Sequence, residues 1–219
     1  MNTKTMMACA AAAALAACGS SNDGGGSGGG VNGVTGTVAG VAFSSSEAIN
    51  AVIQPVTCPV GGVSASVAGL VIGLTNFTGT CAVSGSPCNG KANAQGVVLV
   101  IGNVNLFGTA SPVGPGNYTV SRAGAIPVST SVAFAALGRT DASCNDVAGV
   151  PDVVSGTVTI TSVSVGAASG SVSLVFDDGS TLSGPFSATG CAGFKVDPCS
   201  GTVSGFNGGT CTGTRVCLP

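Results

Sequence analysis

The stretch Gly170-Ser-Val-Ser-Leu-Val-Phe-Asp-Asp-Gly-Ser-Thr-Leu-Ser-Gly-Pro-Phe-Ser-Ala188 decides the fold of this chain. Three apolar residues share one face of a strand, with Ser171 and Ser173 on the other: Val172, Leu174 and Phe176. Asp177-Asp178-Gly179-Ser180 provides a tight turn, and Leu182 and Phe186 continue the apolar face on the return strand. The stretch predicts a β-hairpin with one apolar and one polar face.

The preceding segment, Val153–Val165, extends this hairpin to three strands. Val158 and Ile160 lie on one face, and Val163 and Val165 share a face after a change of phase at Thr161-Ser162. A phase change of one residue is the sequence pattern of a β-bulge. We therefore expect an antiparallel meander of three strands with a bulge at this point.

Short apolar segments separated by Gly, Pro, Asn or Asp recur along the rest of the chain. They predict further strands at Val34–Val38, Ala48–Gln54, Val63–Val67, Leu70–Asn76, Val97–Asn103, Asn117–Arg122 and Val132–Arg139. Pro112–Gly116 marks a loop, and Ser-Ser-Glu-Ala could begin a turn of helix near Ser45–Ala51. Strands this numerous bury their apolar faces against one another, so the fold class is all-β: an antiparallel sandwich or barrel-like meander of about ten strands, stapled by disulfides.

The first 17 residues have the layout of a lipoprotein signal peptide. Lys4 precedes an apolar stretch that ends in Leu15-Ala16-Ala17-Cys18, which resembles a bacterial lipobox. The pattern predicts cleavage before Cys18, whose thiol carries diacylglycerol and whose new amino terminus receives a further acyl chain such as palmitate. The alternative is an ordinary secretory signal in which Cys18 is incidental.

A Gly/Ser-rich tether at 18–33 follows this signal. Gly19–Gly30 contains only Gly, Ser, Asn and Asp, and a flexible segment of this length reaches about 20 Å on average. The remaining residues predict an all-β domain at 34–191 and a Cys-rich extension at 192–219 packed on the same domain. A tether of this kind separates a lipid-anchored domain from the membrane surface.

Apart from Cys9 and Cys18, eight cysteines predict up to four disulfides in an exported chain: Cys58, Cys81, Cys88, Cys144, Cys191, Cys199, Cys211 and Cys217. Cys81–Cys88 across a small loop is one plausible bridge. A zinc site is the alternative, but the chain offers neither a Cys-x-x-Cys pair nor a histidine. We therefore expect no bound metal.

The strand motifs resemble the uncharacterised outer-membrane lipoproteins of Gram-negative soil bacteria. The likeness runs from Gly36 to Cys191 and is carried by Gly36-Thr-Val-Ala-Gly-Val-Ala-Phe43, Leu74-Thr-Asn-Phe-Thr-Gly-Thr-Cys81, Pro115-Gly-Asn-Tyr-Thr-Val120, Thr140-Asp-Ala-Ser-Cys144, Ser155–Val163 and Gly170–Cys191. The resemblance implies an all-β envelope domain and a Cys144–Cys191 disulfide, and it brings no known activity. The sequence departs from that pattern after Cys191.

The composition disfavours several classes of function. The 219 residues include six basic and eight acidic side chains, without a basic cluster, so nucleic acid is not an expected partner. The absence of histidine and of a Ser-x-x-Lys pair argues against the common nucleophilic enzymes. Tryptophan is absent and Tyr118 is the single tyrosine, which makes an aromatic sugar-binding platform improbable. We expect no enzymatic activity and no cofactor.

Three local patterns have both a functional and a structural interpretation, and the structural one is favoured for each. Asp141, Asn145, Asp146 and Asp152 could supply oxygen ligands for calcium, but their spacing is not that of a calcium loop. Asp177 and Asp178 are adjacent turn residues rather than a convergent catalytic pair. The alternating threonines from Thr157 to Thr161 are typical of an ordinary strand.

The expected function is therefore that of a lipoprotein anchored in the outer membrane, with a non-catalytic structural or binding domain facing the periplasm or the cell surface. The loops Ser111–Gly116 and Asp141–Asp152 are the expected contact surface for an envelope protein or glycan. A glycan-acting enzyme is one alternative. An integral outer-membrane barrel, which the mean hydropathy of +0.58 would suit, is the other.

Overall fold

A computed structural model describes residues 32–60, 63–85, 88–122, 131–199, 202–204 and 216–219. The described residues are almost entirely β-structure, as the sequence predicts. The elements are β1 (Thr35–Val38), β2 (Val41–Ser44), β3 (Glu47–Val60), β4 (Val63–Thr75), α2 (Thr80–Ser84), β5 (Asn89–Lys91), β6 (Gln95–Asn105), β7 (Gly116–Ser121), β8 (Ser131–Arg139), β9 (Val153–Ser164), β10 (Ala167–Phe176), β11 (Thr181–Gly190), β12 (Lys195–Asp197), β13 (Thr202–Ser204) and β14 (Val216–Leu218).

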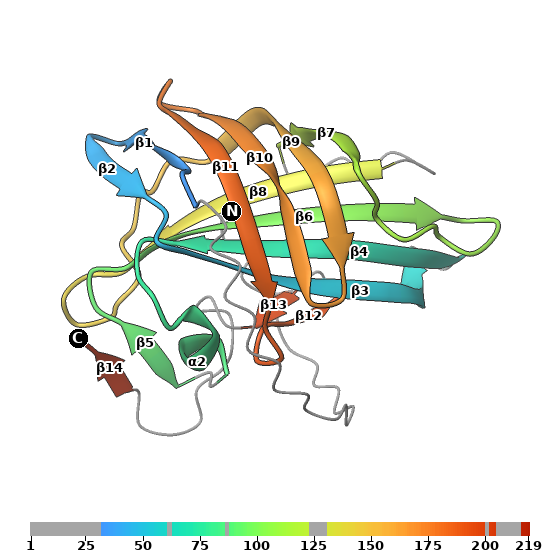
Figure 1. Cartoon of the computed structure of the whole chain (residues 1–219), viewed down its shortest axis with the longest axis horizontal. Helices are drawn as coiled ribbons and strands as arrows, with labels where there is room; N and C mark the ends of the chain where they lie inside the picture. The colour runs from blue at the N-terminus through green and yellow to red at the C-terminus, as the bar shows by residue number, and fades with distance from the viewer. Residues whose placement is uncertain (1–31, 61–62, 86–87, 123–130, 200–201, 205–215) are drawn as a thin grey trace.

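Eight strands form a closed barrel in the order β10-β9-β7-β8-β6-β4-β3-β11, and β11 pairs back onto β10. In Figure 1 the strands β9, β10 and β11 cross steeply in front of β3, β4, β6 and β8. Most pairs are antiparallel, as expected. Two neighbours are parallel, however: β3 with β11 through Ile49 and Thr189, and β7 with β8 through Val120 and Ala133. These short parallel contacts close the barrel into a mixed sheet.

The meander β9-β10-β11 forms as the sequence predicts, except that β9 ends at Ser164 and Val165, predicted to share the face of Val163, is 78% exposed. The register between β9 and β10 moves from Ser169 opposite Ser162 to Gly170 opposite Ile160, which leaves Thr161 as the extra residue of a bulge. The inward face is buried and the outward face carries serine and threonine. The turn at 177–180 closes with a hydrogen bond from the backbone N–H of Phe176 to the carbonyl oxygen of Ser180.

The barrel interior is a packed apolar core, as an eight-stranded barrel of this kind allows. Leu70, Ile72, Leu99 and Leu174 are fully buried there. The β1–β2 hairpin covers one end with Val38 and Phe43, and the loop between β6 and β7 covers the other with Val113. The chain thus fills its barrel with side chains and closes both ends.

A second, smaller core lies on the outer surface of β3 and β4. Ile49 and Val71 point outward and are covered by Phe194 and Cys191 from the segment that follows β11. These strands are therefore apolar on both faces. The start of the Cys-rich extension supplies the cover that the outer face needs.

Two expectations about local structure are wrong. Residues 47–51 belong to strand β3, so no turn of helix forms near Ser45–Ala51. The Ser45 hydroxyl instead accepts a hydrogen bond from the backbone N–H of Val34, and the Glu47 carboxylate caps α2. The segments Val63–Val67 and Leu70–Asn76 are one continuous strand, β4, because Gly69 pairs in register rather than breaking the strand.

The disulfides differ from both pairings that the sequence suggested. Cys191 bonds to Cys81 and Cys144 bonds to Cys217, so neither Cys144–Cys191 nor Cys81–Cys88 forms. A third bridge joins Cys58 to Cys199. Cys88 is also disulfide-bonded, whereas Cys211 lies outside the described residues. Cys199 is thereby bonded to β3, and Cys217 to the loop that follows β8.

Candidate functional site

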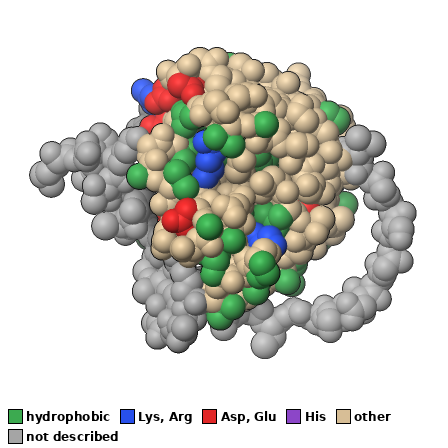
Figure 2. Space-filling view, turned by 90° about the vertical axis from the view of Figure 1, so that its left-hand side faces the viewer, with side chains coloured by type: hydrophobic (Ala, Val, Ile, Leu, Met, Phe, Trp, Pro, Cys, Tyr) green, Lys and Arg blue, Asp and Glu red, His purple; other side chains and the backbone are tan. Residues whose placement is uncertain are grey.

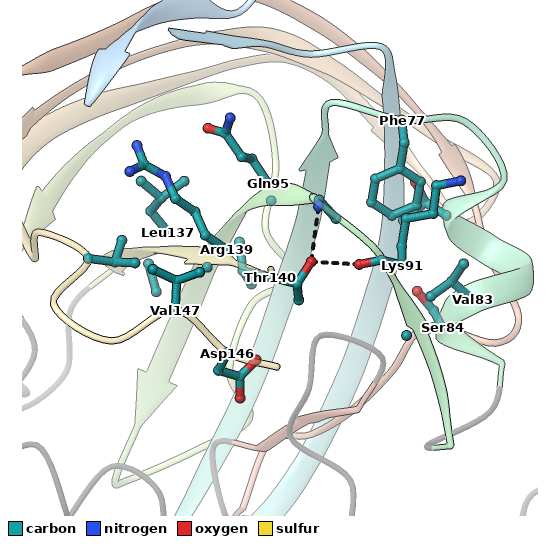
Figure 3. Close-up of a pocket in the computed structure, with 18 residues that line it drawn as sticks. Phe77, Val83, Ser84, Lys91, Gln95, Leu137, Arg139, Thr140, Asp146 and Val147 are labelled. Carbon is teal, nitrogen blue, oxygen red and sulfur yellow. Dashed lines mark hydrogen bonds between the residues drawn. The ribbon is translucent and has the colours of Figure 1, made fainter. Parts of the chain in front are cut away.

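A pocket of about 390 Å³ lies where β6 begins and β8 ends (Figure 3). The two strands supply its floor, α2 and β5 supply one wall, and residues 140–150 supply another. This volume falls within the usual range for small-molecule sites. Figure 2 views the side of the molecule that lies at the left in Figure 1, where few and scattered charged side chains lie beside apolar ones.

The wall formed by α2 is fixed by polar contacts to β3 and β4. The Glu47 carboxylate accepts a 2.7 Å hydrogen bond from the backbone N–H of Thr80, at the first residue of the helix. The hydroxyls of Thr80 and Thr75 are 2.6 Å apart, and both side chains are buried. A helix this short has little stability of its own, so these contacts hold Val83 and Ser84 against the pocket.

The wall formed by β5 depends on the C-terminus. β5 pairs with β14, and the Cys144–Cys217 disulfide crosses directly beside that pair. A Cβ atom on Gly90 would lie 2.9 Å from the Cβ of Cys144, so a glycine is needed at this close approach. The Lys91 ammonium donates a hydrogen bond to the carbonyl oxygen of Pro219. The last residues of the chain are therefore part of the architecture around the pocket.

Thr140 joins the two walls at the middle of the pocket (Figure 3). Its hydroxyl accepts a 2.9 Å hydrogen bond from the backbone N–H of Ala94 and donates a 2.5 Å bond to the carbonyl oxygen of Lys91. Gln95 and Arg139 lie to one side of Thr140 in this view, and Phe77 and Ser84 lie to the other.

Most of the lining side chains are apolar, as in many small-molecule sites: Phe77, Val83, Ala94, Val98, Ala136, Leu137, Val147 and Val150. The lining also contains two cations, Lys91 and Arg139, and one carboxylate, Asp146. The recorded ion pair within the described residues, Arg122–Asp177 at 3.7 Å, lies outside the pocket lining. The pocket is thus apolar with a positive bias.

Three lining residues each have a buried polar atom without a hydrogen-bond partner: Oγ of Ser84, Oε1 of Gln95 and Nε of Arg139. The described part of the chain has two more such atoms, both on the Asn50 side chain inside the barrel. An unpaired buried polar group costs about 1–3 kcal/mol, so native proteins keep few of them. Gln95 and Arg139 continue the barrel-facing side of β6 and β8, whereas Ser84 lies on α2, so these atoms do not form one cluster. The volume and mixed lining of the pocket make it the candidate functional site.

Gln95 and Arg139 are direct neighbours across the β6–β8 pair. Both side chains also bind the β1–β2 hairpin: Nε2 of Gln95 donates a 3.1 Å bond to the carbonyl oxygen of Ala42, and the Arg139 guanidinium donates to that of Val38. These bonds fix the amide orientation of Gln95, so its Oε1 is an acceptor. Burial lowers the pKa of Arg139, and the nearby Asp178 carboxylate opposes that effect. The guanidinium nevertheless stays charged at neutral pH.

The acidic residues singled out in the sequence do not gather into a site. The Asp141 carboxylate accepts bonds from the backbone N–H groups of Ser143 and Asn145, which stabilise its loop and lower its pKa. Asp177 pairs with Arg122, while Asp178 bonds within its own turn. No group of three or more His, Cys, Asp or Glu side chains in the described residues is arranged to hold a metal ion.

The two loops expected to form a contact surface have different positions. Part of Asp141–Asp152 lines the pocket through Asp146, Val147 and Val150. Ser111–Gly116 instead covers the barrel end, where the Tyr118 hydroxyl donates a 2.7 Å bond to the carbonyl oxygen of Gly114. The predicted lipid attachment point, Cys18, lies outside the described residues, as does the tether up to residue 31.

The sequence interpretation did not identify Ser84, Gln95 or Arg139. The sequence does contain a feature that distinguishes Arg139, since it is one of six basic residues and ends an apolar strand. The pocket itself is formed by segments far apart in the chain, so no local motif marks it.

Comparisons of the chain with protein-family models, with curated proteins and with solved structures find no match. No helix in the described ranges has the length and apolar character needed to cross a membrane.

Proposed function

We propose that this protein is an outer-membrane lipoprotein, anchored through Cys18, whose barrel domain binds a small ligand without catalysing a reaction. The sequence Leu15-Ala16-Ala17-Cys18 supports the anchor, and the Gly-rich tether behind it supports a domain held away from the lipid surface. Several acyl chains, at about 0.8 kcal/mol per buried methylene, make such an anchor long-lived.

The disulfides are consistent with an exported location. Bridges such as Cys58–Cys199 and Cys81–Cys191 form and persist in oxidising compartments. The resemblance to outer-membrane lipoproteins points to the same compartment.

The distribution of polarity favours a domain in water over an integral membrane barrel. The interior is apolar, and the outward face of β9, β10 and β11 carries Ser and Thr at alternating positions. A lipid-embedded barrel has an apolar outer band instead. The barrel domain is therefore proposed to lie beside the membrane, on its periplasmic or external face.

The pocket is the single observation on which the binding role depends. Its lining combines apolar side chains with a few polar and charged ones, which is typical of small-molecule sites. A binding role is favoured over a glycan-acting enzyme because the lining holds one carboxylate, Asp146, whereas glycoside hydrolysis uses a pair.

Lipid labelling tests the anchor. Cells expressing the full chain are given an alkyne-bearing palmitate analogue, and the protein is expected to carry the label and to fractionate with outer membranes. Cys18→Ser is expected to lose both properties, while Cys9→Ser, within the signal, keeps them. Label that survives Cys18→Ser would refute the proposed attachment. Protease treatment of intact cells then assigns the face, because an external domain is cleaved and a periplasmic one is protected.

A further inference from the structure

A disulfide beside the pocket joins two of its walls. β14 pairs with β5, and Gly90 and Lys91 of β5 line the pocket. Cys217 of β14 is bonded to Cys144, which lies in the loop that forms another wall, residues 140–150. The Cys144–Cys217 bridge therefore connects the wall formed by β5 to the wall formed by this loop.

β14 depends on this disulfide for its attachment to β5. The two strands form a two-stranded sheet, which has little stability of its own in water. Val216 is 48% exposed and Cys217 is exposed as well, so the strand buries little apolar surface. Backbone hydrogen bonds support the pairing, such as the 2.9 Å bond from the N–H of Ala92 to the carbonyl oxygen of Leu218. We expect the covalent bond to Cys144 to provide most of the hold on β14.

The backbone conformation of Cys144 favours breakage of the bridge. Its φ is 61°, in the left-handed region that residues other than glycine seldom occupy. Among the described cysteines, Cys144 alone has a positive φ. Such a conformation is costly and persists where the surrounding structure imposes it. Reduction removes this constraint from Cys144, and strained or exposed disulfides are the ones most easily reduced.

We propose that the Cys144–Cys217 disulfide is a redox-sensitive clamp on the pocket. The oxidised form holds β14 on β5 and keeps the two walls joined. Reduction by a dithiol of the cell envelope releases β14 and loosens both walls. This device goes beyond the binding role proposed above, and it operates whether or not a ligand occupies the pocket.

The reduction step begins at Cys217. Cys217 is exposed, whereas Cys144 is 1% exposed, so a thiolate of the dithiol attacks the Sγ of Cys217. The bond between the two Sγ atoms breaks, and Cys144 leaves as a thiolate that takes up a proton. The second thiol of the reductant then displaces Cys217 from the mixed disulfide. The dithiol loses two electrons and becomes a disulfide, while Cys144 and Cys217 become thiols.

Graded reduction tests the order in which the bridges open. The full chain, purified from the envelope in a non-ionic detergent, is equilibrated with rising concentrations of dithiothreitol. Free thiols are blocked with N-ethylmaleimide, and the labelled cysteines are identified by mass spectrometry. Cys144 and Cys217 are expected to become labelled at about tenfold lower dithiothreitol than Cys58 and Cys81.

Amide hydrogen exchange reports whether β14 then leaves β5. The N–H of Ala92 donates to the carbonyl oxygen of Leu218, and the N–H of Val216 donates to that of Cys88. Both amides are protected from exchange while these bonds persist. Selective reduction is expected to remove this protection and to leave exchange in β10 unchanged.

Two glycine variants tune the clamp. A Cβ atom on Gly90 would lie 2.9 Å from the Cβ of Cys144, so Gly90→Ala adds strain at the bridge. This variant is expected to lower the dithiothreitol concentration that reduces Cys144–Cys217. Gly138→Ala is the matched control, since Gly138 also lines the pocket but a Cβ there would meet nothing within 4 Å. It should leave that concentration unchanged.

A double variant, Cys144→Ser with Cys217→Ser, imitates the reduced state. Its Ala92 amide is expected to exchange rapidly without any reductant. In the unaltered protein, labelling of the described bridges at one common dithiothreitol concentration would overturn the proposal, because no bridge would then open first. An Ala92 amide that stays protected after Cys144 and Cys217 are labelled would overturn it as well. Neither measurement depends on the lipid anchor or on a ligand, so failure of the clamp is distinguishable from failure of the proposed function.

Discussion

The carboxylate of Asp178 accepts a hydrogen bond from the backbone N–H of Ala39 at 3.1 Å, joining the turn between β10 and β11 to the turn between β1 and β2. The same carboxylate accepts bonds from the backbone N–H and the hydroxyl of Ser180. These bonds lower the pKa of Asp178, those from Ser180 most strongly. A single exposed side chain thus helps to hold the β1–β2 hairpin over the barrel end.

This lowered pKa predicts a loss of stability in acid. The unfolded-state pKa of aspartate is about 3.9, so a lowered folded-state value stabilises the protein above that pH and the stabilisation is lost as the pH falls through the folded value. Asp178→Asn is expected to reduce the difference in urea midpoint between pH 6 and pH 2.5. Ser171→Ala, an exposed and non-titrating control, should leave that difference unchanged. An unaltered difference in Asp178→Asn would contradict the assignment.

The disulfide between Cys81 and Cys191 joins α2 to the segment after β11, across a sequence separation of 110 residues. Replacing both cysteines with alanine is expected to lower the free energy of unfolding by about 2–5 kcal/mol, because the unfolded chain regains the freedom of a long loop. Chemical denaturation measures this loss. Peptide mapping without reduction checks the connectivity directly, and a fragment linking Cys144 to Cys191 would disprove the arrangement described here.

Gly170 lies at the β9–β10 bulge, where a Cβ atom would be 1.9 Å from the carbonyl oxygen of Thr159. Gly170→Ala therefore forces two backbones apart and is expected to cost about 1–3 kcal/mol of stability or more. Gly138→Ala on β8 is the matched control, because a Cβ there would meet nothing within 4 Å. Thermal unfolding should separate the two variants. If they melted together, the close strand approach would be incorrect.

Asn50 is 1% exposed and shares the inner face of β3 with Ala48 and Val52, yet neither polar atom of its amide has a partner. Asn50→Leu keeps a similar shape and removes this unsatisfied group. The variant is expected to gain about 1–3 kcal/mol in free energy of unfolding, measured in urea. Ser173→Leu, on an exposed position of β10, should change stability by no more than about 0.5 kcal/mol. A destabilised Asn50→Leu would indicate that the amide has a bonding partner, such as a buried water.

The strands were predictable where the sequence alternates. From Ser171 to Phe176 in β10, every second residue is apolar and buried, so both the strand and its buried face follow from local chemistry. The bulge at Thr161 was predictable for the same reason, because the extra residue shifts the alternation of apolar and polar side chains by one position. Local sequence does not decide between a sandwich and a barrel. That choice depends on pairing between the first and last barrel strands, β3 and β11, through Ile49 and Thr189.

The prediction of a helical turn near Ser45–Ala51 is wrong, and Glu47 stabilises a different helix. Glu47 does cap a helix, but the helix is α2, and its first residue, Thr80, is brought there by the β3–β4 hairpin. Thr80 lies 33 residues further along the chain than Glu47, so local sequence does not indicate this contact. The pocket was not predictable from local sequence either, since Gln95 and Arg139 become neighbours only when β6 pairs with β8.

Cysteine pairing was the least predictable feature. Cys191 and Cys144 each bond to a residue whose proximity depends on the path of the chain outside the main sheet. Eight cysteines allow 105 connectivities, and spacing alone does not choose among them.

The position of β11 near the end of the sequence affects how the barrel folds. β11 is the last strand of the barrel, and it must pair with both β10 and the first barrel strand, β3. Contacts between such distant segments make folding slow, because the chain must lose entropy before the contacts form. Until then the edges of β3 and β10 remain open to pairing with other chains. The newly made protein is therefore most vulnerable to aggregation in the interval before its last strand closes the barrel.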